Sequence, residues 1–214
     1  STFRDAGGLW DKYPVEQVAT PEGYARDPEL VIHFYNERRK QLLDVKPNRG
    51  HELLAELEKH FNVTVITQNV DNLHERAGST HVIHLHGELT KVCSSRDPNN
   101  PHYIKELKPE EYEVRMGDCA GDGSQLRPFI VWFGEAVPAI ETAIDIVEKA
   151  DIFVIIGTSM NVYPAAGLLN YVPRTAEVYL IDPKPVDTHT SRSIHVVQKG
   201  ASEGVAELKH LLGL

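Results

Sequence analysis

The polar residues that could bind a ligand or move a proton follow short apolar runs along the chain. Gln68, Asn69 and Asp71 come directly after one run, and His86 with Gly87 follows the next. Amides and carboxylates bind the hydroxyl and amide groups of a nucleotide, while an imidazole with an ordinary pKa of about 6.5 accepts a proton near neutral pH. Turn formation explains any one of these residues alone, since Asn, Asp and Gly favour turns. Their repetition behind successive apolar runs favours a nucleotide site.

Three later runs continue the pattern. The polar or small residues behind them are Gly134 with Glu135, then Thr158 with Ser159, and finally Asp182. Each run is short and rich in β-branched residues, which is typical of a buried strand. The predicted strands are residues 61–67, 82–85, 129–133, 152–157 and 178–181.

Helical patterns separate several of these predicted strands and would hold the polar residues in place. Asn48 is suited to cap one helix, Pro138 to begin a second and Gly200 to precede the last. Alternating strands and helices predict an α/β fold, with a Rossmann-like parallel sheet and helices on both faces. Ligands of such sheets bind beyond the carboxyl ends of the strands, where these polar residues are expected.

Two stretches interrupt the alternation and predict a smaller lobe formed by two insertions. The first has no strand pattern but contains a helix from Asp27 or Pro28 to about Leu43, whereas the second is polar and rich in Pro, Asn, Asp and Gly. The expected division is 1–10, 46–89 and 128–214 for the Rossmann-like domain, with 11–45 and 90–127 for the lobe.

Composition restricts the class of partner. The net charge of −9 argues against nucleic-acid binding, which needs clustered Lys and Arg, and is compatible with basic partners such as lysine-bearing protein segments. No run of roughly 18 apolar residues occurs, so no membrane span is expected. The 2 cysteines are too few for a disulfide framework, which favours a reduced, cytoplasmic protein.

Five segments, in order along the chain, resemble the motifs of the sirtuin family. Each is a weak pattern alone, but the ordered set is specific and runs from Thr2 towards the final helix. The resemblance implies an NAD-dependent deacylase that removes acyl groups from lysines of proteins or peptides and yields nicotinamide and O-acyl-ADP-ribose. The segments are TFRDAGGLW from Thr2, TQNVDNLH from Thr67, HLHGEL from His84, LRPFIVWFGE from Leu126 and GTSMNVYPAAGL from Gly157.

The resemblance assigns roles to the matching residues. His86 corresponds to the general base of the family, and Asn69 is the second catalytic candidate, lining the nicotinamide pocket with Asp71. Asp182 stands where many sirtuins have Asn, although a carboxylate also accepts hydrogen bonds from ribose hydroxyls. The other expected NAD contacts are Phe3, Arg4, Gln68, Gly157, Thr158, Ser159 and Ala201. The segment expected to bind acyl-lysine, and to pair with the substrate as an added strand, contains Val131, Phe133 and Gly134.

Tyr35 and Arg38 lie three residues apart on the predicted helix, which places them on one face. They look like the Tyr-x-x-Arg pair of class III sirtuins, which remove succinyl, malonyl and glutaryl groups. A dicarboxylic acyl chain brings a carboxylate into an apolar tunnel, where an Arg fork and a Tyr hydroxyl can pair it. A solvated charged face is the alternative, because Glu37, Arg39 and Lys40 are neighbours. We therefore expect desuccinylation or demalonylation, with acetyl as a further substrate.

The zinc pattern of the family is incomplete in this chain. Most sirtuins hold a structural zinc ion with two Cys-x-x-Cys pairs, whereas here each pair keeps one cysteine, Cys93 or Cys119. A closed zinc site needs four N or S ligands, so we expect no zinc, although His102 or Asp122 could in principle complete a site. The second insertion is thus expected to be a degenerate zinc-ribbon-like module.

The Gly-Ala-Gly-x-Ser loop of the family, which gives backbone donors to the NAD phosphates, precedes the TFR segment, and this chain starts at Ser1 after that point. We expect the native protein to have residues ahead of Ser1; a disabled fragment is the alternative. Two other functions stay open: a non-catalytic module that binds NAD, ADP-ribose or acyl-lysine, and a mono-ADP-ribosyltransferase. No Gly-x-Gly-x-x-Gly follows a predicted strand, which argues against a nicotinamide oxidoreductase.

Overall fold

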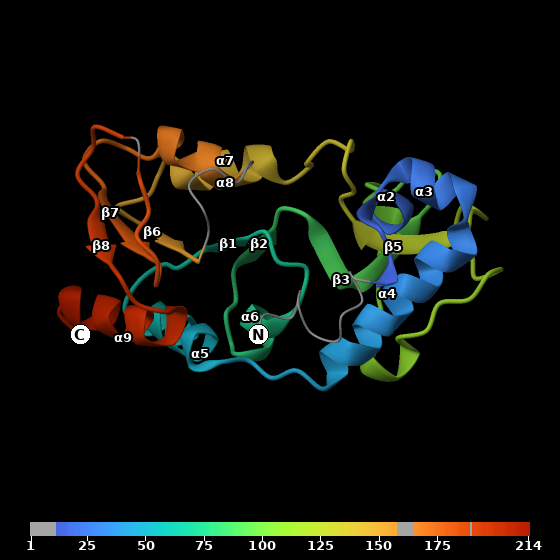
Figure 1. Cartoon of the computed structure of the whole chain (residues 1–214), viewed down its shortest axis with the longest axis horizontal. Helices are drawn as coiled ribbons and strands as arrows, with labels where there is room; N and C mark the ends of the chain where they lie inside the picture. The colour runs from blue at the N-terminus through green and yellow to red at the C-terminus, as the bar shows by residue number, and fades with distance from the viewer. Residues whose placement is uncertain (1–11, 158–164, 189) are drawn as a thin grey trace. The chain divides into compact units, whose positions relative to one another are not determined.

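The computed structural model describes residues 12–157, 165–188 and 190–214, and its elements are labelled in Figure 1. The chain folds as two compact units, which are described separately below. Unit 1 comprises the described residues of Ser1–Lys46, Thr67–Asn72 and His84–Pro138. Unit 2 comprises Pro47–Ile66, Leu73–Ile83 and the described residues of Ala139–Leu214.

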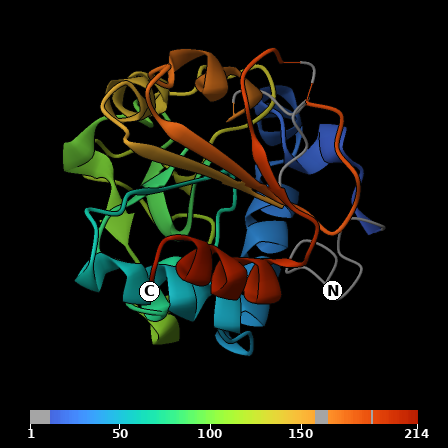
Figure 2. The same ribbon diagram turned by 90° about the vertical axis from the view of Figure 1, so that its left-hand side faces the viewer.

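Unit 2 is built around a parallel sheet of three strands. Helices α5 (Arg49–Glu56) and α9 (Ala201–Leu211) cover one face of the sheet, and α7 (Ile140–Val147) with α8 (Ala165–Leu168) covers the other, as Figure 1 and Figure 2 show. This arrangement is the expected Rossmann-like α/β fold. The strands, in sheet order, are β6 (Ile152–Ile156), β7 (Glu177–Ile181) and β8 (His195–Val197).

Local sequence features account for the helices of unit 2. Asn48 caps α5 by accepting from the N–H of His51, whose ring accepts from the N–H of Asn48 in return. Gly200 precedes α9, as predicted. Gly204 lets α9 approach β7 closely, because a Cβ at this position would lie 2.2 Å from Cγ2 of Ile181. The buried core is formed by Leu53, Leu57, Tyr179, Ile181, Val197, Val205 and Leu208.

Unit 1 combines helices with a small antiparallel sheet. Asp27 caps the long helix by accepting from the N–H of Leu30, as its position in the sequence predicts. Ile32 of the same helix joins Val92 and Val114 in a buried cluster. The helices are α2 (Val15–Val18), α3 (Pro21–Arg26) and α4 (Pro28–Leu43), and the strands, in sheet order, are β4 (Lys105–Glu106), β3 (Gly87–Ser94) and β5 (Leu126–Ile130).

Shorter elements complete the described chain. Strands β1 (Val65–Thr67) and β2 (Val82–His84) form a two-stranded sheet, and α6 (Leu73–Arg76) lies between them in the sequence. Within the described residues, no helix has both the length and the hydropathy needed to cross a lipid bilayer. The single-turn 3₁₀ helices are Leu57–Lys59, Pro101–Tyr103, Pro109–Glu111 and Leu169–Tyr171.

The strand predicted at residues 129–133 is wrong in its extent and its partner. The observed strand β5 ends at Ile130 and pairs antiparallel with β3. The N–H groups of Trp132 and Phe133 instead donate to the Glu135 side chain and the Ala19 carbonyl, so these residues leave the sheet.

Other boundaries also differ from the expectation. Strand β1 begins at Val65 rather than at residue 61. Strand β3 continues through residues 90–94, which the sequence assigned to a polar insertion, because Val92 and Cys93 supply a fully buried pair within it. Helix α7 begins at Ile140 rather than at Pro138, and Ala139 is its N-cap residue. The division into a Rossmann-like domain and an inserted lobe stays a prediction, since the two compact units have other bounds and do not test it.

Candidate active site

The loop that follows β1 is held in place by its backbone. The N–H of Asn69 donates to Oγ1 of Thr67 over 3.0 Å, and the carbonyl of Asn69 lies 2.9 Å from Nδ1 of His84. A carbonyl only accepts hydrogen bonds, so Nδ1 of His84 carries the proton. The N–H of Leu89 donates to the carbonyl of Val70. The next residue, Asp71, is buried. These contacts fix the backbone that carries the Asn69 amide and the Asp71 carboxylate.

His86 follows β2 and is about half-buried. Its Nε2 lies 3.4 Å from Oε1 of Gln68, so the structure brings these two predicted site residues together. Burial lowers the pKa of His86 below its ordinary value of 6.5, which favours the neutral imidazole that can accept a proton. The backbone is anchored, because the carbonyl of His86 accepts from the N–H of Val131 over 2.9 Å.

The backbone conformation and the close packing at position 87, directly after His86, require a glycine. Its φ is 86°, and a Cβ there would lie 2.1 Å from the carbonyl oxygen of Phe129. The residue therefore permits the close approach of β3 to β5, where Gly87 pairs with Ile130. The same approach sets the position of His86 relative to β5.

The segment predicted to bind acyl-lysine already uses two of its backbone donors. The N–H of Val131 donates to His86, and that of Phe133 donates to the Ala19 carbonyl over 3.0 Å. The Phe133 side chain is 65% exposed, and no atom lies within 4 Å of where a Cβ on Gly134 would be.

Tyr35 and Arg38 lie together on α4, as their spacing predicts. Their exposed fractions are only 1% and 8%, and Cζ of Arg38 is 5.7 Å from the centroid of the Tyr35 ring. The alternative of a solvated charged face is wrong for this pair: Arg39 is also buried, whereas Glu37 is partly exposed and Lys40 is exposed. Burial raises the pKa of Tyr35 above its ordinary value of 10.0, so its hydroxyl keeps its proton.

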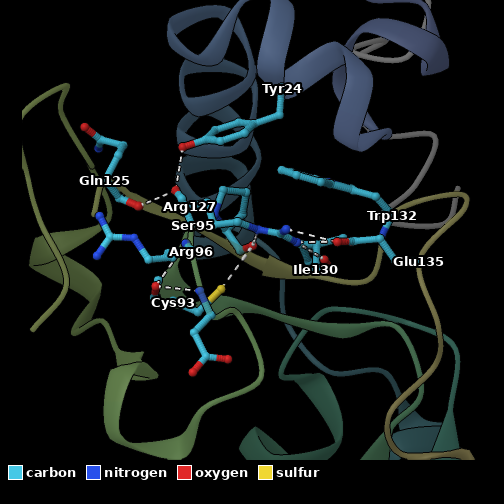
Figure 3. Close-up of polar contacts among 12 residues, drawn as sticks. Tyr24, Cys93, Ser95, Arg96, Gln125, Arg127, Ile130, Trp132 and Glu135 are labelled. Atoms are coloured by element: carbon cyan, nitrogen blue, oxygen red, sulfur yellow. Dashed lines mark hydrogen bonds and ion pairs between the residues drawn. The ribbon is translucent and has the colours of Figure 1, made fainter. Parts of the chain in front are cut away.

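Arg127 and Trp132 of the LRPFIVWFGE segment were not singled out from the sequence, but together with Glu135 they organise this region. Arg127 forms a two-pronged ion pair with Glu135, at 3.1 and 3.2 Å, and its Cζ lies 3.8 Å from the centroid of the Trp132 ring (Figure 3). Nε1 of Trp132 donates to the hydroxyl of Tyr35 over 3.0 Å. Opposite charges at the two ends of the motif, Arg127 and Glu135, were the only available signal in the sequence.

Arg39 forms structural hydrogen bonds that its charged neighbours in the sequence do not indicate. It donates to the carbonyls of Tyr112 and Leu89 and to the Asn36 side chain, and so joins α4 to the rest of unit 1. Burial lowers the pKa of Arg39 to about 10, which leaves the guanidinium charged at neutral pH. We assign it a structural role.

Unit 2 brings three predicted NAD contacts to the carboxyl edge of its sheet. Gly157 follows β6, Asp182 follows β7, and Ala201 begins the helix after β8. The N–H of Gly157 donates to the carbonyl of Ile181, the last residue of β7. Oδ1 of Asp182 accepts from the N–H of Lys184 over 2.8 Å.

Gly157 presents backbone without a side chain at the edge of the sheet. Among the described residues, apart from its chain neighbours, no heavy atom lies within 4 Å of where a Cβ on Gly157 would be, and its φ is 60°. A phosphate or ribose group can approach bare backbone of this kind. The remaining predicted contacts, Phe3, Arg4, Thr158 and Ser159, lie outside the described residues.

The residues at the four cysteine positions of the family do not fit a zinc site. The Cys93 thiol (Figure 3) is buried, which raises its pKa to about 12, and it faces the Pro128 carbonyl. Cys119 is exposed. At the other two positions, Arg96 donates to the carbonyl of Asp122 over 3.2 Å. Among the described residues, neither cysteine belongs to a cluster of potential metal ligands. The absence of zinc stays a prediction.

Comparison with known proteins places this geometry in a family. Residues 1–164 match the model of the Sir2 family. An NAD-dependent protein deacylase of Bacteroides thetaiotaomicron is 89% identical over 99% of this chain and 91% of its own length. One of Helicobacter pylori is 48% identical over 97% of this chain and 88% of its own length.

Solved structures agree with the sequence relatives. A Sir2 homologue in complex with NAD has a TM-score of 0.82 and 37% identity, over 100% of this chain and 83% of that one. A mutant Sir2 homologue in complex with ADP-ribose has a TM-score of 0.81 and 36% identity, over 100% and 87%. The α/β fold, the ordered motifs and these relatives define the class. The chain belongs to the Sir2 family, the sirtuins.

Proposed function

We propose that this sirtuin removes acidic acyl groups, succinyl and malonyl, from lysine side chains of proteins in an NAD-dependent reaction. The coarser activity, NAD-dependent protein deacylation, follows from the family and from the relatives named above. The observation that supports the finer one is the burial of Tyr35 and Arg38 side by side on α4.

The argument for an acidic acyl group is electrostatic. A buried guanidinium keeps its charge and offers donors in a planar fork that matches a carboxylate. A succinyl or malonyl chain ends in such a carboxylate, whereas an acetyl group ends in a methyl. The acidic chain therefore gains charge-assisted hydrogen bonds from Arg38 and a further one from the Tyr35 hydroxyl.

The catalytic roles proposed for the other residues follow from their chemistry. NAD supplies the ribose carbon that accepts the acyl oxygen, with nicotinamide as the leaving group. His86, neutral because of its lowered pKa, takes a proton from a ribose hydroxyl. Asn69 and Asp71, on the anchored loop after β1, bind the carboxamide of nicotinamide. In unit 2, Gly157 and Asp182 bind the phosphate and ribose groups.

Replacing Arg38 tests the proposal. Arg38→Met keeps a flexible, unbranched apolar stem but removes the charge, so we expect kcat/KM for a succinyl-lysine peptide to fall about a hundredfold or more. Because the acetyl group has no carboxylate, the ratio of succinyl to acetyl activity should fall by the same factor. Steady-state kinetics on matched peptides with saturating NAD gives both values.

Lys40→Met is the matched control, because it removes a positive charge from the solvent-facing side of the same helix. It should leave the ratio of the two activities unchanged. An equal loss of desuccinylation and deacetylation in Arg38→Met would contradict the assigned role. Nicotinamide release without any acyl peptide would instead favour an ADP-ribosyltransferase.

A further inference from the structure

The hydroxyl of Tyr35 has a fixed direction in this structure. Nε1 of Trp132 carries a hydrogen and is only a donor, so at 3.0 Å the Tyr35 oxygen must be the acceptor. The single hydrogen of the Tyr35 hydroxyl therefore points away from the indole. Within the described part of the chain, no other group forms a hydrogen bond with this hydroxyl.

Trp132 is itself held by contacts on its ring and on its backbone. Its N–H donates to Oε1 of Glu135 over 2.8 Å, and Glu135 is paired with Arg127. The Arg127 guanidinium lies over the indole and also donates to the Ile130 carbonyl over 2.7 Å (Figure 3). The Tyr24 ring packs against the indole with a centroid distance of 5.4 Å. The indole N–H is thus a pre-oriented donor.

We infer that Trp132 is a positioning residue for acyl selectivity: its indole N–H turns the Tyr35 hydroxyl so that it donates to the carboxylate of an acidic acyl chain beside Arg38. This inference rests on the proposed function. Burial keeps Tyr35 protonated, so the hydroxyl remains a donor at neutral pH. Pre-orientation matters because a hydroxyl that must first rotate into place loses part of the binding free energy.

Trp132 should act on selectivity rather than on the chemical step. Nothing in an acetyl group accepts a hydrogen bond at the position of the distal carboxylate, so deacetylation gains little from the orientation of Tyr35. The effect on a succinyl peptide should appear mainly in KM, because the carboxylate is bound in the ground state and in the transition state alike.

The variant Trp132→Phe removes the N–H but keeps an aromatic ring under Arg127. We expect the succinyl-to-acetyl ratio of kcat/KM to fall about five- to tenfold, the size expected for one weakened hydrogen bond to a charged group. In a Tyr35→Phe background, the same change should have little further effect, because the hydroxyl that it orients is gone. Tyr24→Phe, which alters a ring on the same indole but not the Tyr35 hydroxyl, should leave the ratio unchanged.

The outcomes separate the inference from the proposed function. If Arg38→Met abolishes the succinyl preference while Trp132→Phe leaves the ratio unaltered, the role of Trp132 is overturned and the proposed function stands. If the unaltered protein has no succinyl preference, the proposed function fails first. Additive effects of Trp132→Phe and Tyr35→Phe would also overturn the inference.

A second measurement covers the case in which Trp132→Phe does not fold. The chain has 2 tryptophans, so the indole N–H signals are few and assignable by NMR. The Trp132 signal should shift more on addition of a succinyl-lysine peptide than of an acetyl-lysine peptide, and Tyr35→Phe should remove the difference. Equal shifts with both peptides in the unaltered protein would overturn the inference.

Discussion

At the scale of single residues, backbone anchoring and burial support the role in proton transfer that we propose for His86. Its carbonyl is tied to Val131, and Gly87 brings the following strand close to β5. Because the imidazole is half-buried, its pKa lies below 6.5. A lower pKa means that the neutral form, which is the base, persists to more acidic pH.

This shift leads to a prediction for the pH profile of kcat/KM. Activity should fall as the pH drops through the pKa of His86, and the midpoint of this acidic limb should lie below the ordinary value of 6.5. The rates should be measured with one acyl peptide at subsaturating concentration, after the protein has been shown to stay folded across the range. An acidic limb centred at or above the ordinary value would contradict the account of His86.

Replacement of His86 is the companion to that profile. His86→Gln keeps polarity and approximate size but cannot act as a base, so all acyl activities should fall together, by about a hundredfold or more. Arg38→Met, in contrast, should change the ratio between acyl groups. A His86 variant that lost only one acyl activity would show that the residue contacts the acyl chain instead.

Individual residues also show what the sequence can and cannot predict about the site. Ordered motifs predicted His86 and the loop after β1, and the i, i+3 spacing predicted the Tyr35 and Arg38 pair. The sequence did not indicate a special role for Trp132, because it lies within an apolar run that is typical of a buried strand. Its contact with Tyr35 joins positions 97 apart in the sequence, and such contacts have no local signature.

At the scale of elements, a network of hydrogen bonds holds the turn-rich module around β3 and β5. The Asp122 carboxylate accepts from the hydroxyls of Ser94 and Ser124, and Ser94 also accepts from the N–H groups of Arg96 and Asp97. These bonds lower the pKa of Asp122 to about 2, the bond from Ser94 contributing most. The side chain is near the surface, so the network fixes the turn rather than supplying a buried ion pair.

Asp122→Asn should therefore lower the melting temperature of the protein. The folded-state pKa of Asp122 is depressed, so its contribution is fully present above the unfolded value of about 3.9 and is lost as the pH falls through about 2. The difference in melting temperature from the unaltered protein should be constant above about pH 5 and shrink below pH 4. Asp145→Asn, on the exposed side of α7, is the control and should leave the melting temperature nearly unchanged.

Elements differ in how well the sequence predicts them. Helix α4 was predicted correctly because Asp27, Pro28 and the residues after them give an unambiguous start and a long period. Strand β5 was misplaced, because an apolar run cannot reveal which strand it pairs with. The strand ends at Ile130 because the N–H groups of Trp132 and Phe133 donate to acceptors outside the sheet. The positions of these acceptors depend on the tertiary fold.

At the scale of the whole molecule, the family assignment and the preference for acidic acyl groups rest on different evidence. Membership in the Sir2 family rests on a match to residues 1–164 and on relatives and structures that cover nearly the whole chain. The acyl preference rests on a few buried side chains within unit 1. The two conclusions can therefore be tested separately.

The most direct test of the central claim compares the acyl groups on the unaltered, full-length protein. One peptide carrying succinyl-, malonyl- or acetyl-lysine is incubated with NAD, and deacylated peptide and nicotinamide are quantified together. The account predicts that kcat/KM is higher for the succinyl and malonyl peptides than for the acetyl peptide, with one nicotinamide released per acyl group removed. A kcat/KM for the acetyl peptide equal to or above that for both acidic peptides would contradict it.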